Sequence, residues 1–396
     1  MAGIYIHIPF CKQACNYCNF HFSTSLQLKE ELIAALVKEI QLASTKNSKV
    51  AVDSLNPAFY PKISPLQPSK EIIETIYFGG GTPSILSIAD LELLFAALKE
   101  NFDFAAGVEI TLEANPDDIS PSKLALWRKV GINRLSVGIQ SFIEKELVWM
   151  NRAHTAVESL QCIDDIKAAG FTDFSVDLIY GSPLLSNEDW QQNVALVFEK
   201  DIPHISCYAL TVEPKTALDK MIAQQKKAPV DAEKQAEQFV LLMNWMQQAG
   251  YDHYEISNFA KPGKRSQHNS SYWQGKKYYG FGPSAHAFDG KRRQWNVANN
   301  ALYIQSLKNN TIPFEEEILT QTQQLNEYIM TSLRTMEGLD LNYVAENFGV
   351  NFCTELIAAC KKWTNSGKIL YTNYTLRLSN KGKLFADGIA ADLFFT

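Results

Sequence analysis

Alternation between two kinds of segment constrains the fold of this chain most strongly. From residue 3 to about 250, short runs rich in β-branched residues alternate with longer amphipathic segments. Such alternation is typical of repeated βα units around a parallel sheet. We expect six strands, at residues 3–8, 74–79, 108–113, 134–139, 174–180 and 204–210. Because a closed barrel of this type needs eight units, the pattern predicts an α/β fold with a partial (β/α)6 barrel.

The segments between the expected strands carry helix start and stop signals. Between residues 32 and 40, apolar side chains recur at the spacing of one helix face, which we expect to pack on the sheet. Gly131, Gly170 and Gly250 fall where helices are expected to end. Residues that resemble helix N-caps precede the later helices: Ser87 with Asp90, Ser120 with Pro121, Thr155 with Glu158, and Ser186 with Asp189.

Composition places the chain among ordinary globular proteins. It has 396 residues, of which 46% are hydrophobic and 20% charged, and its formal net charge is -6. No stretch reaches the roughly 18 consecutive apolar residues of a membrane span, and the apolar run at residues 4–10 is better interpreted as a strand than as part of a signal peptide. We therefore expect a cytoplasmic protein, and the acidic balance gives no indication of nucleic-acid binding.

Three further regions depart from the βα pattern. Residues 43–70 contain four prolines and no periodicity, so we expect a surface loop inserted into the domain formed by residues 1–250. Residues 251–315 are rich in aromatic residues and glycine. Residues 316–396 suggest helices followed by a hairpin near 368–378, the order of a winged-helix-like α+β domain. Since residues 320–396 hold seven basic and seven acidic side chains, packing or partner docking is favoured over DNA binding.

Three cysteines near the N-terminus carry the strongest chemical signal. Cys11, Cys15 and Cys18 have the spacing C-x3-C-x2-C. Three thiolates can hold three corners of a [4Fe–4S] cluster and leave one iron open. A zinc site normally needs four ligands, and unpaired structural cysteines remain the other alternative. The other four cysteines are expected to be free core thiols: Cys162, Cys207, Cys353 and Cys360.

The segment from Tyr5 to Phe20, which contains the three cysteines, resembles the radical S-adenosylmethionine (SAM) superfamily. More narrowly, it is similar to the branch that contains oxygen-independent coproporphyrinogen III oxidase-like dehydrogenases and their heme-chaperone relatives. The resemblance implies a radical SAM barrel and a [4Fe–4S] cluster whose open iron chelates SAM. It also implies an electron donor, because electron transfer to SAM yields methionine and a 5′-deoxyadenosyl radical.

A glycine-rich turn follows the second expected strand. Its sequence is Gly79-Gly80-Gly81-Thr82, and glycine allows a backbone to approach a ligand closely. Considered alone, the turn has an equally good interpretation as a simple tight turn. The resemblance implies that Gly80, Gly81 and Thr82 help to bind SAM, at the loop that receives its methionine amino group.

Polar residues also follow the later strands. At or just beyond strand ends lie Glu113, Gln140, Arg152 and Asp177, where barrel enzymes place their active sites. A lone glutamate usually marks only a solvated loop, but the resemblance implies that all four contact SAM. It also implies that Tyr5 and Tyr17 pack against the cluster or the adenine, although a core position is nearly as good an interpretation.

A second constellation lies in the aromatic segment. It contains His268-Asn269-Ser270-Ser271-Tyr272-Trp273, and His286 follows a second aromatic and glycine-rich run. A single histidine beside tryptophan is most often structural. The resemblance implies a motif of heme chaperones, which makes His268 our first candidate for heme contact and His286 our second. Nearby basic residues could pair with heme propionates or be solvated loop charges: Lys261, Lys264, Arg265, Lys291, Arg292 and Arg293.

Two functions follow from the resemblance, and they belong to different classes. One is a chaperone that binds heme and transfers it to an acceptor protein, and the other is coproporphyrinogen III dehydrogenase. The dehydrogenases carry a further cysteine where this chain has Phe20, and an N-terminal extension before the first strand. Both differences favour the chaperone, while a radical enzyme with another substrate remains a third interpretation. A membrane-associated acceptor and a homodimer stay open.

Overall fold

A computed structural model describes residues 1–44 and 72–396. These residues form two compact units that interleave along the chain. Unit 1 comprises 1–174, 213–224 and 276–317, and unit 2 comprises 175–212, 225–275 and 318–396. Most of the expected loop at 43–70 lies outside the described residues. The expected domain boundaries at 250 and 316 remain predictions.

Unit 1 is built on a sheet whose central strands are parallel. The strand order in this unit is β12-β11-β10-β9-β1-β2-β3-β4. β1 pairs in parallel with both β2 and β9, β3 continues in parallel between β2 and β4, and β10 is antiparallel to its neighbours. The strands are β1 (Ala2–Ile8), β2 (Ile73–Gly80), β3 (Phe104–Ala114), β4 (Arg134–Gln140), β9 (Tyr278–Phe281), β10 (His286–Phe288), β11 (Arg292–Asn296) and β12 (Phe314–Ile318).

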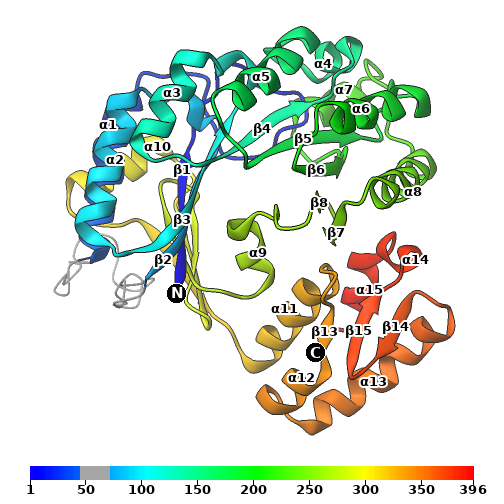
Figure 1. The fold of residues 1–396 in the computed structure, drawn as a ribbon. Coiled ribbons are helices and arrows are strands. Elements are labelled where there is room, and N and C mark those ends of the chain that lie inside the picture. The colour runs from blue at the N-terminus through cyan, green and yellow to red at the C-terminus, as the bar shows by residue number, and fades with distance from the viewer. Residues whose placement is uncertain (45–71) are drawn as a thin grey trace. The chain divides into compact units, whose positions relative to one another are not determined.

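Helices cover the outer face of this sheet (Figure 1). The apolar stripe of the first helix is buried as expected, and Leu32, Leu36 and Ile40 are fully enclosed. Ser87 and Thr155 form complete capping boxes at the helices that they precede. The helices are α1 (Lys29–Ser44), α2 (Ile88–Asn101), α3 (Pro121–Val130), α4 (Glu144–Met150), α5 (Ala156–Ala168), α7 (Ala217–Ala223) and α10 (Asn300–Lys308), with short 3-10 turns η1 (Pro83–Ile85) and η2 (Pro116–Asp118).

Unit 2 contains the two remaining strands of the expected barrel. β5 (Phe174–Tyr180) and β6 (His204–Ala209) pair in parallel. A short antiparallel pair, β7 (Asp252–Glu255) and β8 (Asn258–Ala260), extends the edge of β6. All six expected strands are therefore confirmed, and the largest difference is the start of β3, at Phe104 instead of residue 108. The helices of this part are α6 (Asn187–Glu199), α8 (Ala232–Gln248) and α9 (Gln267–Trp273).

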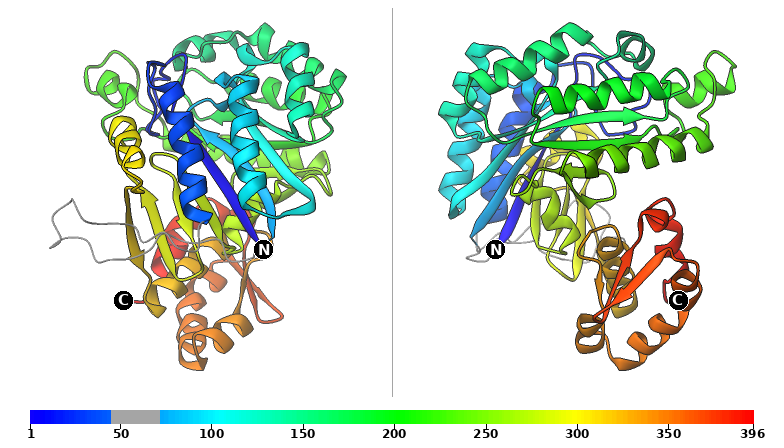
Figure 2. Two further views of the ribbon diagram at one scale, coloured as in Figure 1. Left: turned by 90° about the vertical axis from the view of Figure 1, so that its left-hand side faces the viewer. Right: turned by 45° about the vertical axis from the view of Figure 1, so that its right-hand side comes forward.

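The C-terminal part of unit 2, drawn from orange to red in Figure 2, has a small hydrophobic core. Three helices precede a hairpin whose second strand pairs with β13, and the last two of them together with the hairpin have the expected helix–helix–hairpin order. Leu325, Leu356 and Ile389 are fully buried between these elements. They are α11 (Gln321–Leu333), β13 (Leu339–Asp340), α12 (Leu341–Asn347), α13 (Val350–Asn365), β14 (Ile369–Thr372), β15 (Thr375–Leu378), α14 (Asn380–Lys383) and α15 (Ala386–Asp392).

Within the described part of the chain, no helix has both the length and the apolar composition that crossing a membrane requires.

Candidate functional site

The three cysteines lie on a loop, residues 11–18, that follows β1 in unit 1. Backbone hydrogen bonds hold the loop at several points. The Cys11 amide donates to the Ser23 carbonyl at 3.0 Å, and the Asn16 amide donates to the Met150 carbonyl at 3.1 Å. Residues that lie far apart in the chain thus fix the position of the loop.

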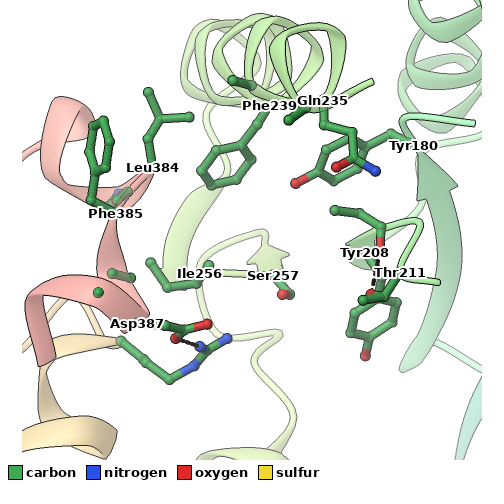
Figure 3. Close-up of a pocket in the computed structure, with 17 residues that line it drawn as sticks. Tyr180, Tyr208, Thr211, Gln235, Phe239, Ile256, Ser257, Leu384, Phe385 and Asp387 are labelled. Carbon is green, nitrogen blue, oxygen red and sulfur yellow. Dashed lines mark hydrogen bonds and ion pairs between the residues drawn. The ribbon is translucent and has the colours of Figure 1, made fainter. Parts of the chain in front are cut away.

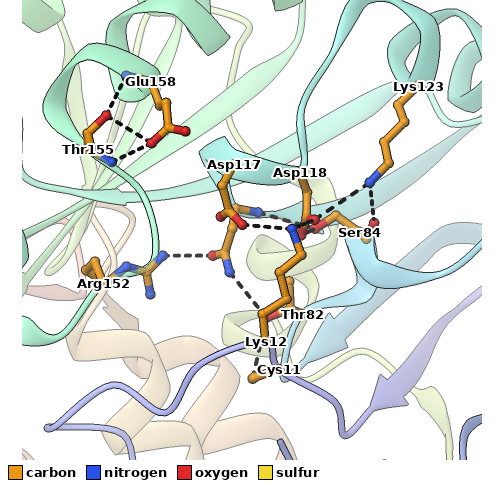
Figure 4. A network of polar contacts seen from close by, with 11 residues as sticks. Cys11, Lys12, Thr82, Ser84, Asp117, Asp118, Lys123, Arg152, Thr155 and Glu158 are labelled. Carbon is orange, nitrogen blue, oxygen red and sulfur yellow. Dashed lines mark hydrogen bonds and ion pairs between the residues drawn. The ribbon is translucent and has the colours of Figure 1, made fainter. Parts of the chain in front are cut away.

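A chain of hydrogen bonds joins two of the cysteines, and Figure 4 shows its part from Cys11 to Arg152. The Thr82 hydroxyl donates to the Cys11 sulfur at 3.4 Å, and the Asn115 amide group donates to the Thr82 oxygen at 3.4 Å. Arg152 then donates from Nη2 to Asn115 Oδ1 at 2.7 Å and from Nη1 to the Cys15 sulfur at 3.2 Å. Since charge-assisted hydrogen bonds favour an anion, these donors suit thiolate sulfurs.

Arg152 makes several hydrogen bonds, but one of its N–H groups has no acceptor in the described residues. Its Nη2 also donates to the Gly138 carbonyl at 2.7 Å. Its Nε is buried and makes no hydrogen bond within residues 1–44 and 72–396. A buried N–H without an acceptor costs about 1–3 kcal/mol. This N–H group is therefore available to donate to a further acceptor, such as the carboxylate of a bound ligand.

The thiols themselves are half-buried. Burial raises the pKa of Cys11, and it raises the pKa of Cys18 to about 11. Both thiols must lose a proton before they can bind iron. No group of His, Cys, Asp or Glu side chains in the described ranges converges as ligands of one metal ion. A [4Fe–4S] cluster with one open iron takes three thiolates, each on a separate iron, whereas a structural zinc ion normally takes four ligands.

The glycine-rich turn presses against the end of β1. Gly80 has φ +112°, and a Cβ there would lie 2.7 Å from the His7 ring. A Cβ on Gly81 would lie 2.6 Å from the Phe10 carbonyl oxygen. Only glycine fits at these two positions, because backbone atoms or a packed ring occupy the space of a side chain. Thr82 is thereby brought to Cys11, as the hydrogen bond above shows.

Glu113 lies beside this turn. Its carboxylate accepts from the Tyr77 hydroxyl at 2.8 Å and from the Gly80 amide at 3.1 Å. The Tyr5 and Tyr77 rings stack with their centroids 6.1 Å apart. Burial, and then the charge of Glu113, raise the pKa of Tyr5. The structure therefore brings together the predicted residues Tyr5 in the middle of β1, Gly80 at the end of β2 and Glu113 near the end of β3.

Gln140 ends β4 in the left-handed region, with φ 67°. For a residue other than glycine this backbone costs of order 1–3 kcal/mol, and such strain clusters at functional sites. A Cβ on Gly138 would lie 2.9 Å from Gln140 Nε2 and 3.3 Å from Arg152 Nη2, so both side chains border the same glycine. Tyr17 lies close to the Cys15 and Arg152 side chains, and its burial raises its pKa.

Asp177 belongs to unit 2. It lies on β5 opposite Ser206 on β6. The expectation that it joins the other SAM residues therefore remains a prediction.

The histidine motif forms α9 in unit 2. Ser266 caps the helix by accepting from the Asn269 amide. His268 is only 2% exposed, and its Nε2 lies 2.8 Å from the Tyr272 hydroxyl, one turn later. Its imidazole is thus already engaged within the motif.

His286 lies in unit 1 at the start of β10. Its side chain is exposed, and its ring stacks on Trp295 with centroids 6.1 Å apart. Partial burial and the nearby Arg293 lower the pKa of His286, which favours the neutral ring at pH 7. The two heme candidates therefore differ in exposure and belong to different units.

Several residues of the site were not expected from the sequence. Asn115 links Thr82 to Arg152, and Lys12 bridges Asp117 at 2.8 Å and also binds Asp118 (Figure 4). A signal for Asn115 was present, because it follows β3 directly and precedes a proline. The acidic pair has no such signal, since two aspartates in a loop are usually solvated.

A buried carboxylate also escaped the sequence pattern. Glu39 on α1 accepts from the Gly282 amide at 2.8 Å, from Asn296 Nδ2 at 2.6 Å and from the Tyr303 hydroxyl at 2.5 Å. Burial raises the pKa of Glu39 to about 7 against the effect of these three donors. The network ties α1 to β11, α10 and the turn after β9.

Comparisons with known proteins place the chain in a family. The family described as the radical SAM superfamily matches residues 5–197. The heme chaperone HemW of Bacillus subtilis (strain 168) is 31% identical, over 98% of this chain and 98% of the relative. The heme chaperone HemW of Mycobacterium tuberculosis (strain ATCC 25618 / H37Rv) is also 31% identical, over 99% of this chain and 94% of the relative.

A solved structure covers the same span. Coproporphyrinogen III oxidase (HemN) from Escherichia coli, described as a radical SAM enzyme, matches 99% of this chain and 90% of its own, with a TM-score of 0.81 and 22% identity. At this identity the similarity concerns the fold alone. It confirms the expected partial barrel with a smaller C-terminal domain.

Proposed function

Because the chain belongs to the radical SAM superfamily, within the family of the heme chaperone HemW, we propose that it binds heme and transfers it to acceptor proteins. The observation that carries this proposal is the likeness to relatives of that name along nearly the whole of both chains. Relatives that shared only the barrel would leave the segment with the histidine motif unmatched. Here that segment lies inside the matched span.

The cysteine loop is proposed to hold a [4Fe–4S] cluster through Cys11, Cys15 and Cys18. Thr82 and Arg152 support this assignment, because they donate to two of the three sulfurs. When bound, the cluster with SAM at its open iron supplies one-electron reduction. The residues of the chain orient the sulfurs and offset part of their negative charge.

The ends of the strands around the loop are proposed to hold SAM. Glu113 offers carboxylate oxygens to ribose hydroxyls or to an ammonium group, and the turn with Gly80, Gly81 and Thr82 lets a ligand approach the backbone. Arg152 is suited to a carboxylate because its Nε has no other acceptor in the described ranges. The same proposal includes Tyr5, Tyr17, Gln140 and Asp177.

For heme we propose His268 first and His286 second. A neutral imidazole is the form that binds iron. His268 must exchange its hydrogen bond with Tyr272 for a new contact, whereas His286 is exposed. The proposal extends to a cytoplasmic location, an electron donor for the cluster and a heme-acceptor protein.

The alternative is coproporphyrinogen III dehydrogenase activity. At the position of the additional cysteine of those enzymes this chain has Phe20, whose side chain is 69% exposed. The site therefore offers no fourth thiol there, which favours the chaperone.

Anaerobic reconstitution followed by two parallel assays separates these functions. One assay measures heme binding, and the other measures conversion of coproporphyrinogen III in the presence of SAM and a reductant. We expect stoichiometric heme binding without turnover. Formation of protoporphyrinogen would identify a dehydrogenase, and a chain that neither binds heme nor turns over the substrate would overturn both assignments.

A further inference from the structure

A pocket of about 500 Å³ lies within unit 2 (Figure 3). This volume falls in the range of sites for small molecules. The apolar part of its wall includes Phe239 of α8, Ile256 and Leu384. None of the residues proposed to bind the cluster, SAM or heme lines it.

One cation in the wall has an unusual environment. Lys383, at the end of α14, contacts His253 Nδ1 through its ammonium group at 2.9 Å. His253 Nε2 lies 3.0 Å from the Ile256 carbonyl, which can only accept. His253 therefore carries its proton on Nε2, and its Nδ1 accepts from the lysine.

The charge states follow from the same contacts. Burial lowers the pKa of Lys383 to about 8 and that of His253 to about 3, the latter also because of the lysine charge. At pH 7 the lysine is charged and the histidine is neutral. Within the described residues Lys383 has a neutral partner but no carboxylate.

The second cation of the wall is already paired. Arg334 donates from Nε to Glu255 Oε1 at 3.0 Å and from Nη1 to Asp387 Oδ1 at 2.6 Å. Its charge is thus offset by two carboxylates. Lys383 remains the charge that burial destabilises and that a bound anion would stabilise.

We propose that this pocket binds an apolar carboxylic acid, with the carboxylate at Lys383 Nζ and the apolar body against Phe239, Ile256 and Leu384. The carboxylate supplies the missing counterion, and the apolar part of the wall contacts the apolar body of the ligand. A small aromatic acid and a propionate of a porphyrin share this chemistry. The site goes beyond the proposed function, since its existence does not depend on heme transfer.

Calorimetric titration of the full-length chain tests the charge requirement without any substitution. The probes are 2-naphthoic acid, mesoporphyrin IX and the methyl ester of each. We expect at least one of the acids to bind about tenfold more tightly than its ester, because a charge-assisted hydrogen bond is lost on esterification. Equal affinities for acid and ester, or no binding of either acid, would overturn the proposal.

A matched pair of variants then locates the site. Lys383→Met is expected to weaken binding of the acid about tenfold, and Lys381→Met is expected to leave it unchanged, because Lys381 is an exposed neighbour on the same helix. An unchanged affinity in Lys383→Met would overturn the proposal.

The choice of probe identifies the source of the carboxylate. A preference for 2-naphthoic acid assigns it to a small aromatic acid, and a preference for mesoporphyrin assigns it to a propionate. Either preference supports the proposed site if the Lys383→Met variant no longer shows that preference. Titration of His268→Ala with 2-naphthoic acid tests binding in the pocket independently of heme transfer, because this substitution removes only the proposed heme contact.

Discussion

The cysteine loop of unit 1 and the histidine motif of unit 2 present their chemistry in opposite ways. Around the loop, side chains from distant parts of the chain point their donors at sulfur, and the thiols stay half-buried. In the motif, His268 is buried and bonded to Tyr272 on the same helix. The donors of the first site are directed at the sulfurs, whereas the imidazole of His268 in the second site already has a partner within its own helix.

This difference shows what a motif spacing means physically. The spacing of Cys11, Cys15 and Cys18 predicts cluster ligands because few other structures need it. The spacing of His268 and Tyr272 equally suits a helix that stabilises itself one turn apart. A tertiary contact therefore decides whether a side chain is available for binding.

Loss of a proposed cluster ligand should have the largest effect. It tests most directly whether the cysteine loop differs from the histidine motif in binding an additional group. We expect Cys11→Ala, Cys15→Ala or Cys18→Ala to abolish the broad iron–sulfur absorption of anaerobically reconstituted protein. The buried Cys162 provides the control, and Cys162→Ala should keep the absorption. Unchanged iron and sulfide contents in the three variants would exclude the cluster assignment.

Replacement of Arg152 tests whether the hydrogen-bond donors around the cysteine loop of unit 1 bind a ligand. We expect Arg152→Met to lower SAM affinity of the reconstituted protein at least about tenfold, because a charged hydrogen-bond donor is lost. Equilibrium dialysis with labelled SAM measures this. The exposed Arg128, on α3, gives the matched control Arg128→Met. Equal losses in both variants would contradict a specific role for Arg152.

The histidine motif predicts a smaller and more selective effect. His268→Ala should weaken heme binding more than His253→Ala does, by about tenfold if a direct contact is lost. Absorption titration with heme measures both. Tyr272→Phe sharpens the test, since His268 then has no hydroxyl to release, and we expect heme affinity to be unchanged or a few-fold higher. Equal heme affinities of His268→Ala and His253→Ala would contradict the assignment of His268 as a heme contact on the basis of its motif.

The smallest expected effect concerns the pH dependence of stability. Burial raises the pKa of Glu39 to about 7 in the folded chain, from 4.5 in the unfolded chain. The folded state therefore binds more protons between these values, so its stability is complete below pH 4.5 and falls as pH rises through 7. Glutamine does not titrate, so the melting temperature of Glu39→Gln should gain relative to wild type between pH 5 and pH 8.

The control for this effect is the exposed Glu92 on α2. Glu92→Gln should follow wild type across the same range. A constant difference between Glu39→Gln and wild type from pH 5 to pH 8 would show that Glu39 does not titrate there.

The sequence predicted the elements of the fold better than their grouping. The strands were confirmed because β-branched runs bounded by glycine and by helix caps leave few alternatives. The two units interleave along the chain, with residues 213–224 and 276–317 joining the first 174. Local patterns carry no information on such grouping, because it depends on contacts between residues far apart in sequence.

The candidate site likewise contains residues that the sequence predicted and residues that it did not. Cys11 was predicted from the spacing of the cysteines, whereas Gly80 and Glu113 were predicted because they lie at or just beyond the expected ends of strands, where barrels of parallel strands place their active sites. Asn115 was missed even though it bridges Thr82 and Arg152. An asparagine before a proline most often marks a turn, so its local sequence gave it an ordinary interpretation.

By itself the sequence determined the sheet-forming strands, the glycine turn and the three cysteines proposed as cluster ligands. These features depend on residue type and short spacing, which steric and chemical rules restrict strongly. Only the tertiary structure decided that Arg152 donates to Cys15, that His268 is buried and that Lys383 lacks a carboxylate partner in the described residues. Burial and hydrogen bonding depend on which distant groups come together, and no local pattern specifies that.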